Sequence, residues 1–229
     1  MIGAFRPGSR SGSVWVAALV AAALASFSLS GCGDKGGGAA GAGGVATTHF
    51  VNSHDDAKSP GLAAHYIDFS FDYPSSWTVD PDTGTATASN FIKVSRQDAA
   101  KTDIENFAVG DFEASGNPEA DKLLIPQMLN ELEGQVAQGF AGYKRVDIGP
   151  ATVAGQFAQQ LRFTASPMVN GKPLNMFGRV AMVPGPAGSK LGVVLVMLAT
   201  DSGGEFHSVD DVGVKGQLPI ILRSFKIGR

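Results

Sequence analysis

The single cysteine of the chain, Cys32, is the side chain whose position most clearly predicts chemistry. It follows Leu29, Ser30 and Gly31, at the end of an apolar run that begins at Val14. A cysteine sulfur is the nucleophile that transfer of a diacylglyceryl group requires. We therefore expect the sulfur of Cys32 to carry a diacylglyceryl group and the mature chain to begin at this residue.

The first 31 residues have the three parts of a secretory signal. Arg6 and Arg10 precede the apolar run, and small residues end it. The sequence Leu-Ser-Gly-Cys resembles the lipobox of bacterial lipoproteins, in which the freed amine of the cysteine is often acylated as well, for example with palmitate. Two or three acyl chains hold a protein at a membrane far more firmly than one chain does. We expect residues 1–31 to be removed and acylated Cys32 to anchor the protein.

Two other interpretations of this segment are open, and both are less favoured. The apolar run at residues 14–29 is shorter than the roughly 20 residues that a transmembrane helix needs, and it is rich in Ala and Ser. Cys32 as an ordinary free thiol would be a liability in an oxidising compartment, and lipidation removes that liability.

The charge of the mature chain argues against a nucleic-acid partner. Loss of Arg6 and Arg10 with the signal changes the net charge from −3 to −5, whereas nucleic acids select basic surfaces. The sequence has no polybasic patch for anionic lipids, so the expected contact with the bilayer is made by the acyl chains. Without a second cysteine there is no intramolecular disulfide, so an apolar core must stabilise the domain.

A glycine-rich segment follows Cys32. Seven glycines lie between Gly33 and Gly44, and such a segment cannot bury enough apolar surface to become ordered. We expect residues 32–61 to form a flexible tether that spans on the order of 30 Å and holds the domain away from the lipid. The globular domain is expected over residues 62–229.

Hydrophobic patterns predict an antiparallel sheet. In residues 67–73 apolar side chains alternate with polar ones, which predicts a strand with one buried face. Asn170-Gly171 and Pro184-Gly185-Pro186 are turn signals between antiparallel strands. Residues 191–199 are continuously apolar, so we expect this strand to be covered on both faces. The other expected strands are, in chain order, 77–79, 91–95, 107–112, 143–148, 157–163 and 174–183.

Two helices are expected to cover the sheet. Asn117, Pro118 and Glu119 have the residue order of a helix start, and Pro126 is expected to kink this helix or to mark its first turn. The second helix is expected near the C-terminus, where Pro219 requires it to start late or to bend. The face of the first helix that we expect to dock on the sheet carries Leu124, Met128, Leu132 and Val136. The second helix carries Leu218, Ile221, Leu222 and Phe225.

Several segments resemble the PsbP-like superfamily, namely FDYPSSWTVD at 71–80, the central helix, the hairpin meander and ILRSFKI at 221–227. This superfamily includes extrinsic photosystem proteins of chloroplasts, a eukaryotic Ran-binding import factor and bacterial envelope lipoproteins of the DcrB type. The resemblance covers roughly residues 62–227. It implies an α+β fold, a single α/β/α layered domain with a mostly antiparallel sheet of about six to seven strands covered by helices. It also implies an adaptor or assembly role rather than a particular reaction, and no partner-binding residue of the family matches this sequence position by position.

The sequence contains no recognisable catalytic motif. It lacks a nucleophile elbow, a phosphate-binding loop, a zinc-protease motif and paired cysteines. His49 and His54, with two aspartates directly after His54, have ligand types suited to a metal, but the expected tether would not pre-organise them. His65 and His207 flank the domain and are expected to be hydrogen-bonded or solvent-facing. We expect no catalytic residue, metal or cofactor.

Three further groups of residues have competing interpretations. Trp77 is expected in the core rather than in a ligand platform. Phe177 and Arg179 share one face of the expected strand at 174–183, which borders a cleft or lies under a helix. The opposite face carries Met176, Gly178, Val180 and Met182. Several acids lack EF-hand spacing and are expected in solvated turns: Asp80, Asp82, Asp103, Asp210 and Asp211.

These observations favour a non-catalytic, lipid-anchored domain that binds a protein partner or assists envelope assembly, for which an exposed apolar patch is expected. The alternative is a small-ligand-binding protein or hydrolase of the cell envelope, for which a pocket with perturbed pKa values is expected. Gly33 directly follows Cys32, and Asp34 comes one residue later. By resemblance to enterobacterial sorting, this order favours the periplasmic face of the outer membrane, with the plasma membrane as the alternative.

Overall fold

The computed structural model describes residues 44–56, 63, 65–80 and 90–228. The residues of the expected lipobox (Leu29, Ser30 and Gly31), the expected lipidation site Cys32 and most of the expected tether lie outside the described residues. None of the described helices is long and apolar enough to cross a bilayer.

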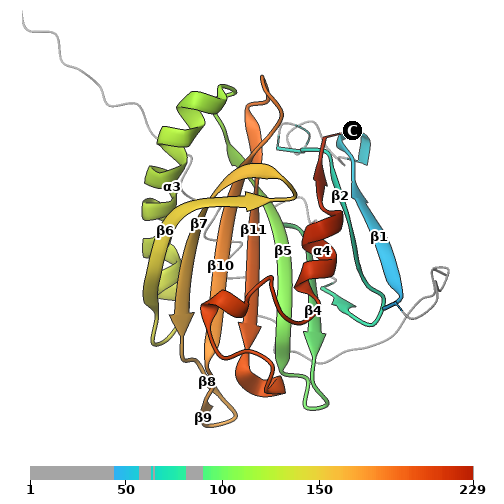
Figure 1. The fold of residues 1–229 in the computed structure, drawn as a ribbon, viewed down its shortest axis with the longest axis vertical. Coiled ribbons are helices and arrows are strands. Elements are labelled where there is room, and N and C mark those ends of the chain that lie inside the picture. The colour runs from blue at the N-terminus through green and yellow to red at the C-terminus, as the bar shows by residue number, and fades with distance from the viewer. Residues whose placement is uncertain (1–43, 57–62, 64, 81–89, 229) are drawn as a thin grey trace, which may run out of the picture.

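A seven-stranded antiparallel sheet forms the centre of the domain (Figure 1). The strand order is β3-β4-β5-β11-β10-β7-β6, so β11 lies in the middle. The apolar run in β11 is buried on both faces, as expected. The strands are β3 (Thr78–Val79), β4 (Asn90–Gln97), β5 (Asp103–Glu113), β6 (Lys144–Val153), β7 (Gln156–Ala165), β10 (Met176–Pro184) and β11 (Leu191–Thr200).

A smaller sheet and a short helix cover one face of the central sheet. The smaller sheet has the order β1-β2-β12, and its strands are β1 (Thr47–Asn52), β2 (Phe69–Pro74) and β12 (Lys226–Ile227). The helix is α4 (Leu218–Ser224). In Figure 1 these elements lie towards the β4 edge of the central sheet. Their apolar side chains share one hydrophobic cluster with one face of β4, β5 and β11.

The presence of β1 corrects the expected extent of the tether. We expected residues 32–61 to be flexible, but Thr47–Asn52 pair with β2 along its whole length, from Thr47 opposite Pro74 to Asn52 opposite Phe69. The physical reason is aromatic packing, because the Phe50 ring lies 5.8 Å from that of Phe69 and 5.4 Å from that of Phe71. Buried Asn52 also donates a hydrogen bond of 2.8 Å from Nδ2 to the carbonyl of Ile67.

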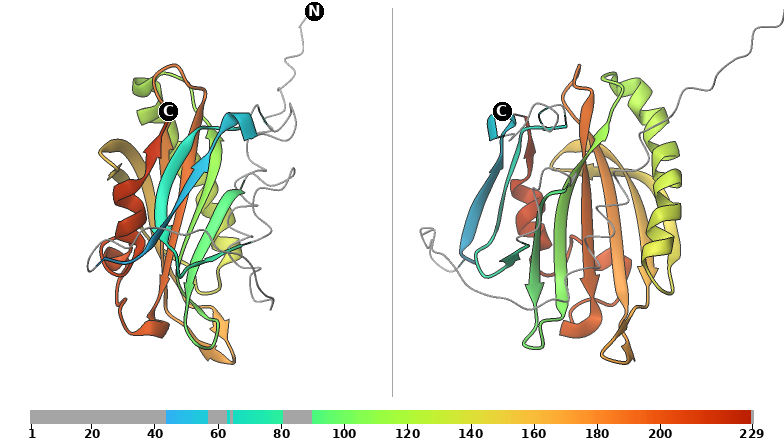
Figure 2. Two further views of the ribbon diagram at one scale, coloured as in Figure 1. Left: turned by 90° about the vertical axis from the view of Figure 1, so that its right-hand side faces the viewer. Right: turned by 180° about the vertical axis from the view of Figure 1, so that it is seen from behind.

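The long helix α3 (Pro118–Gly139) covers the opposite face of the sheet (Figure 2). Asn117 caps it as predicted, since its side-chain oxygen accepts hydrogen bonds from the backbone N–H groups of Glu119 (2.9 Å) and Ala120 (3.3 Å). The helix continues through Pro126, so Pro126 does not mark its first turn. The second hydrophobic cluster lies between α3 and the sheet.

The docking face of α3 differs from the expected one in its first half. Leu124 is 44 % exposed and Met128 is only partly buried. An α-helix has 3.6 residues per turn, so positions four residues apart drift around it, and a continuous docking face combines steps of three and four. The apolar residues that the helix buries are Ile125, Leu129, Leu132 and Val136.

The remaining described elements are short. Asn170 and Gly171 have left-handed φ angles of 52° and 76° and form the predicted turn of a small hairpin. This hairpin consists of β8 (Met168–Val169) and β9 (Lys172–Pro173), and the 3-10 helices are η1 (His54–Asp56), η2 (Asp201–Gly203) and η3 (Val209–Asp211). The fold is the expected α+β class, with the difference that a strand layer shares one face of the sheet with α4.

Candidate functional site

The face of the central sheet opposite α3 carries polar side chains on β7. Leu161, Phe163 and Ala165 are buried, whereas Gln160, Arg162 and Thr164, which alternate with them, are only partly buried. Successive side chains of a strand point to opposite faces, and Leu161, Phe163 and Ala165 belong to the α3 cluster. The polar side chains of β7 therefore lie on the other face of the sheet. Figure 1 shows that β7 is far from the small sheet, which lies towards the opposite edge.

Two aspartates hold Arg162 in place. A register shift in β6 after Arg145 sets Asp147 directly opposite Arg162. The Nε of Arg162 donates to the Oδ1 of Asp147 over 2.9 Å, and its Nη atoms donate to Asp147 Oδ2 and Asp210 Oδ1. The hydrogen bond with Asp147 is the main reason that the pKa of Arg162 is raised and that of Asp147 is lowered. Arg162 thus joins β7 to β6 and to η3.

Arg179 on β10 lies directly opposite Arg162, and its environment is very different. The Nε of Arg179 is buried and has no hydrogen-bond partner. Among the described residues no carboxylate forms an ion pair with Arg179. Burial lowers the pKa of this guanidinium, and the like charge of Arg162 lowers it further. An unpaired charge that is partly buried costs folding free energy, so Arg179 is the unusual cation of this face.

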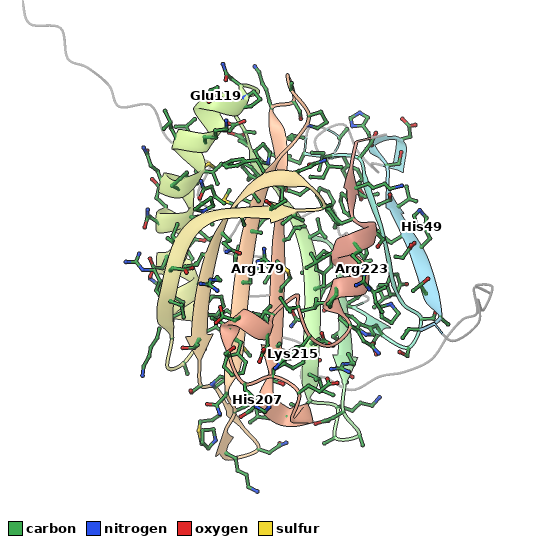
Figure 3. All side chains as sticks on the ribbon, in the orientation of Figure 1. His49, Glu119, Arg179, His207, Lys215 and Arg223 are labelled. Atoms are coloured by element: carbon green, nitrogen blue, oxygen red, sulfur yellow. The ribbon has the colours of Figure 1, made fainter. Side chains whose placement is uncertain are left out.

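The loop after η3 and helix α4 come close to the Arg179 guanidinium. Gly213 has a left-handed φ of 79°, and a Cβ built on it would lie 3.4 Å from Arg179 Nη1 and 2.8 Å from Leu222 Cδ1. Glycine therefore allows this loop to pass next to both side chains. Figure 3 shows Arg179 on the central sheet, above the loop that carries Lys215, with α4 and its Arg223 farther to the right.

A hydrogen-bond acceptor without a partner lies near Arg179. The Oε1 of Gln160 is buried and accepts no hydrogen bond. Gln160 precedes Arg162 by two residues on the same face of β7, and it lies opposite Ala181 on β10. Gln160 and Arg179 are therefore diagonal neighbours on adjacent strands, a relation in which long side chains reach each other.

Glu105, a buried carboxylate, holds α4 beside this region. Its Oε1 accepts hydrogen bonds from the backbone N–H groups of Gln217 (3.0 Å) and Leu218 (3.1 Å). The Nε of Arg96 lies 2.8 Å from its other oxygen. Burial raises the pKa of Glu105, and these contacts oppose that rise. We interpret this cluster as structural, because its partners are the first residues of α4.

His65 and His207 lie at opposite ends of β5. The Nδ1 of His65 is 3.2 Å from Asp111 Oδ2, near the end of the strand, and burial raises the pKa of Asp111. The chain that leads to His207 passes the start of β5, where Thr200 Oγ1 donates to the carbonyl of Asp103 over 2.6 Å. The two histidines therefore do not meet.

The other predicted residues are dispersed. His49 lies in β1 with its Nδ1 2.6 Å from Asp72 Oδ1, and His54 begins η1, so neither belongs to a flexible tether. Trp77 is a core residue, as predicted, and its Nε1 donates to Gln217 Oε1 over 2.6 Å. The described parts of the chain contain no group of three side chains able to hold a metal.

The expected turn acids do not gather at one place. Asp82 lies outside the described residues. The others contact different side chains: Asp80 lies near Lys93, Asp103 accepts from Gln97, Asp210 pairs with Arg162 and Asp211 pairs with Lys215. Phe177 is buried in the cluster of the α4 face, so the strand at 176–184 is partly covered on that side.

The sequence interpretation identified Arg179 but missed its neighbours Arg162, Gln160 and Asp147. Gln160 and Arg162 alternate with buried Leu161 and Phe163, which places Gln160 and Arg162 on one face of β7. This was a usable signal within β7. Their position opposite β10 and β6 depends on strand register, including the shift before Asp147.

Comparisons with known proteins found likenesses in structure. No protein-family model matches the chain, and no curated protein matches it. The chain is similar to the solution structure of cyanobacterial PsbP (CyanoP) from Synechocystis sp. PCC 6803, with a TM-score of 0.48 and 14 % identity over 84 % of this chain and 98 % of that one. It is also similar to LpqN of Mycobacterium tuberculosis, a protein involved in cell envelope biogenesis, with a TM-score of 0.43 and 15 % identity over 80 % and 92 %. At these identities neither likeness assigns a function to this chain.

Proposed function

We propose that this chain is a lipoprotein of the bacterial cell envelope, of the DcrB type, whose folded domain binds a partner and catalyses no reaction. The observation that carries the anchoring is the Leu-Ser-Gly-Cys sequence after an apolar run, which makes Cys32 the expected acylated residue. A glycine-rich segment between Cys32 and the domain supports a tethered position at the membrane surface.

Exposed leucines on α3 support a protein partner. Leu123 is 72 % exposed and its neighbour Leu124 is 44 % exposed, on the side of α3 that the sheet does not cover. The free energy falls when another surface covers large apolar side chains that were exposed to water. We propose that this part of α3 contacts another protein of the envelope.

The contacts of buried Glu105 and of partly buried Arg162 support a structural role for these two ionisable groups. Glu105 binds the first residues of α4, and Arg162 joins β6, β7 and η3. Such contacts between elements are typical of structural ion pairs. This supports a binding role rather than catalysis.

The anchoring is tested with Cys32→Ser. We expect this variant to keep its signal sequence and to carry no radiolabelled palmitate, because serine lacks the nucleophilic sulfur. Ser28→Ala, in the same signal, is the matched control and should be processed normally. Normal cleavage of Cys32→Ser, or palmitate labelling equal to that of the wild type, would overturn the lipoprotein proposal.

The protein partner is tested by chemical crosslinking of the lipidated chain in its own membrane, followed by mass spectrometry. We expect one envelope protein to be recovered repeatedly and to be lost in the double variant Leu123→Lys, Leu124→Lys. Val214→Lys is a control at another exposed apolar residue, which is 71 % exposed. Recovery that is unchanged in the double variant would exclude α3 as the contact.

A second candidate, binding of a small ligand, is favoured by a different observation. Arg179 Nε and Gln160 Oε1 are buried polar atoms without partners on the same face of the sheet. Most buried polar atoms in proteins have a partner, so this pair suggests a ligand that supplies one.

A further inference from the structure

We infer that Arg179 and Gln160 bind a small oxyanion, a carboxylate or a phosphate, on the sheet face between β6 and α4. This inference rests on the second candidate function above and names the chemical class of its ligand. The Arg179 guanidinium donates to the anion, and the Gln160 side-chain oxygen accepts from a hydroxyl group of the same ligand.

The donor half of the site is a cation that the protein leaves unsatisfied. A guanidinium has five N–H donors in a planar arrangement that matches carboxylate and phosphate oxygens. No hydrogen bond or ion pair joins Arg179 to any of the described residues, and its Nε is buried. Carboxylates are present on this face, because Arg162, directly opposite Arg179, forms ion pairs with both Asp147 and Asp210. The partner that Arg179 lacks is therefore an anion from outside the chain.

The two aspartates near the site do not serve Arg179. Asp147 accepts two hydrogen bonds from Arg162, and Asp210 accepts a third. These contacts hold the Arg162 guanidinium on the β6 and η3 side of β7. Its charge remains close enough to lower the pKa of Arg179, and the same charge attracts an anion that binds there.

The acceptor half of the site restricts the ligand further. Gln160 Oε1 is buried without a donor, and an anion alone would not satisfy it. A hydroxy acid or a protonated phosphate group carries both an anionic oxygen and an O–H donor. The diagonal positions of Gln160 and Arg179 are separated by roughly 7–8 Å between Cα atoms in an antiparallel sheet, a span that long side chains and one small molecule can bridge.

Neighbouring elements hold the site in shape. Gly213 brings the loop after η3 next to the Arg179 guanidinium, and Leu222 of α4 lies beside Gly213. Met197, opposite Arg179 on β11, adds an apolar wall. Apolar surroundings strengthen a charged hydrogen bond because they exclude water. Glu105 in turn fixes the start of α4.

The test is a titration of the full chain in dodecyl maltoside micelles at constant ionic strength. The probes are acetate, glycolate and inorganic phosphate, with chloride as the reference anion. The readouts are the melting temperature, which rises when a ligand binds the folded state, and the NMR signal of the Arg179 Nε–H group. We expect saturable binding and a shift of this signal. In Arg179→Met we expect the dissociation constant to rise about tenfold, because the lost hydrogen bonds to a charged group change a binding constant by at least this factor.

Matched variants separate the site from general charge effects. Arg223→Met removes an exposed arginine of α4 that is not part of the proposed site, and this variant should leave binding unchanged. Gln160→Leu should bind acetate as the wild type does but lose the preference for glycolate, whose hydroxyl needs the acceptor. Without added anion, Arg179→Met should melt at the wild-type temperature or higher, which shows that the variant is folded.

The source of the anion is distinguished by a lipid arm. Micelles doped with phosphatidylglycerol should shift the Arg179 signal if the natural ligand is a lipid headgroup, with phosphatidylcholine as the control; a response to free anions alone identifies a soluble ligand. Two results would overturn the inference: no shift of the Arg179 signal with any probe, or a rise in melting temperature with added anion that is as large in Arg179→Met as in the wild type. Crosslinking to a protein through α3 is independent of this result, so the two proposals fail separately.

Discussion

The two faces of the central sheet are stabilised in different ways. On the α3 face two phenylalanines cover glycines that lie directly opposite them, Phe163 over Gly178 and Phe112 over Gly192. A Cβ on either glycine would lie 2.1 Å or 2.3 Å from the ring, so each ring occupies the space of the missing side chain. The other face is apolar under α4 and the small sheet but carries Arg162 and Arg179 on β7 and β10.

This difference indicates where binding can evolve. An apolar face packed by aromatic rings tolerates few changes, since close-packed interiors transmit the effect of each added or removed group. The half of the other face that carries the arginines is held by ion pairs between exposed or partly exposed side chains, which contribute little to stability. Ligand-binding residues are therefore less constrained there.

The largest effect is expected at the interface between α3 and the sheet. Leu129→Ala should lower the free energy of unfolding by about 2–5 kcal/mol, because Leu129 is fully buried and its loss leaves a cavity. Leu124→Ala on the same helix should change it by less than about 0.5 kcal/mol. Urea denaturation measures both. Equal losses would contradict the docking face described for α3.

An intermediate effect is expected for Gly178→Ala, which adds the Cβ that meets the Phe163 ring. Overpacking of this kind costs about 1–3 kcal/mol. A double-mutant cycle by thermal denaturation should show that Gly178→Ala costs less in a Phe163→Leu background, because the smaller side chain leaves room. Additive losses would mean that the ring does not depend on the glycine.

The smallest effect is expected for Asp111, on the sheet face opposite α3, as a dependence of the free energy of unfolding on pH. Burial raises the pKa of Asp111 above its ordinary value of 3.8, so the folded state binds the proton more tightly than the unfolded state. Asp111 therefore stabilises the fold below pH 3.8, and this contribution is lost as the pH rises through the raised pKa. Urea denaturation between about pH 3 and pH 7 should show this decline in the wild type and not in Asp111→Asn. Identical pH profiles would assign the decline to other groups.

Local sequence patterns predicted those helices, turns and strands whose formation depends on residues that are adjacent in sequence. Asn117 marks the start of α3, Asn170 and Gly171 form their turn, and the apolar run of β11 is buried on both faces. Caps, tight turns and strand burial depend on a few adjacent residues. The pattern was less reliable for the phase of α3, because a spacing of four residues does not match the helical repeat.

Segments with weak local patterns were decided by distant contacts. Thr47–Asn52 follows a glycine-rich stretch and was expected in the tether, yet it pairs with β2. Its place depends on Phe50, which packs on the rings of Phe69 and Phe71. Such packing is visible only when strands are assembled.

The sequence by itself determined the expected anchor at Cys32, the α+β class and most of the strands and helices, because these depend on composition and on hydrophobic periodicity along the chain. The tertiary structure alone decided which charges meet. Arg162 reaches Asp210 across 48 residues of chain, and strand register sets Arg179 opposite Arg162 without an aspartate of its own. Charge pairing depends on distances in space, and a linear pattern does not contain those distances.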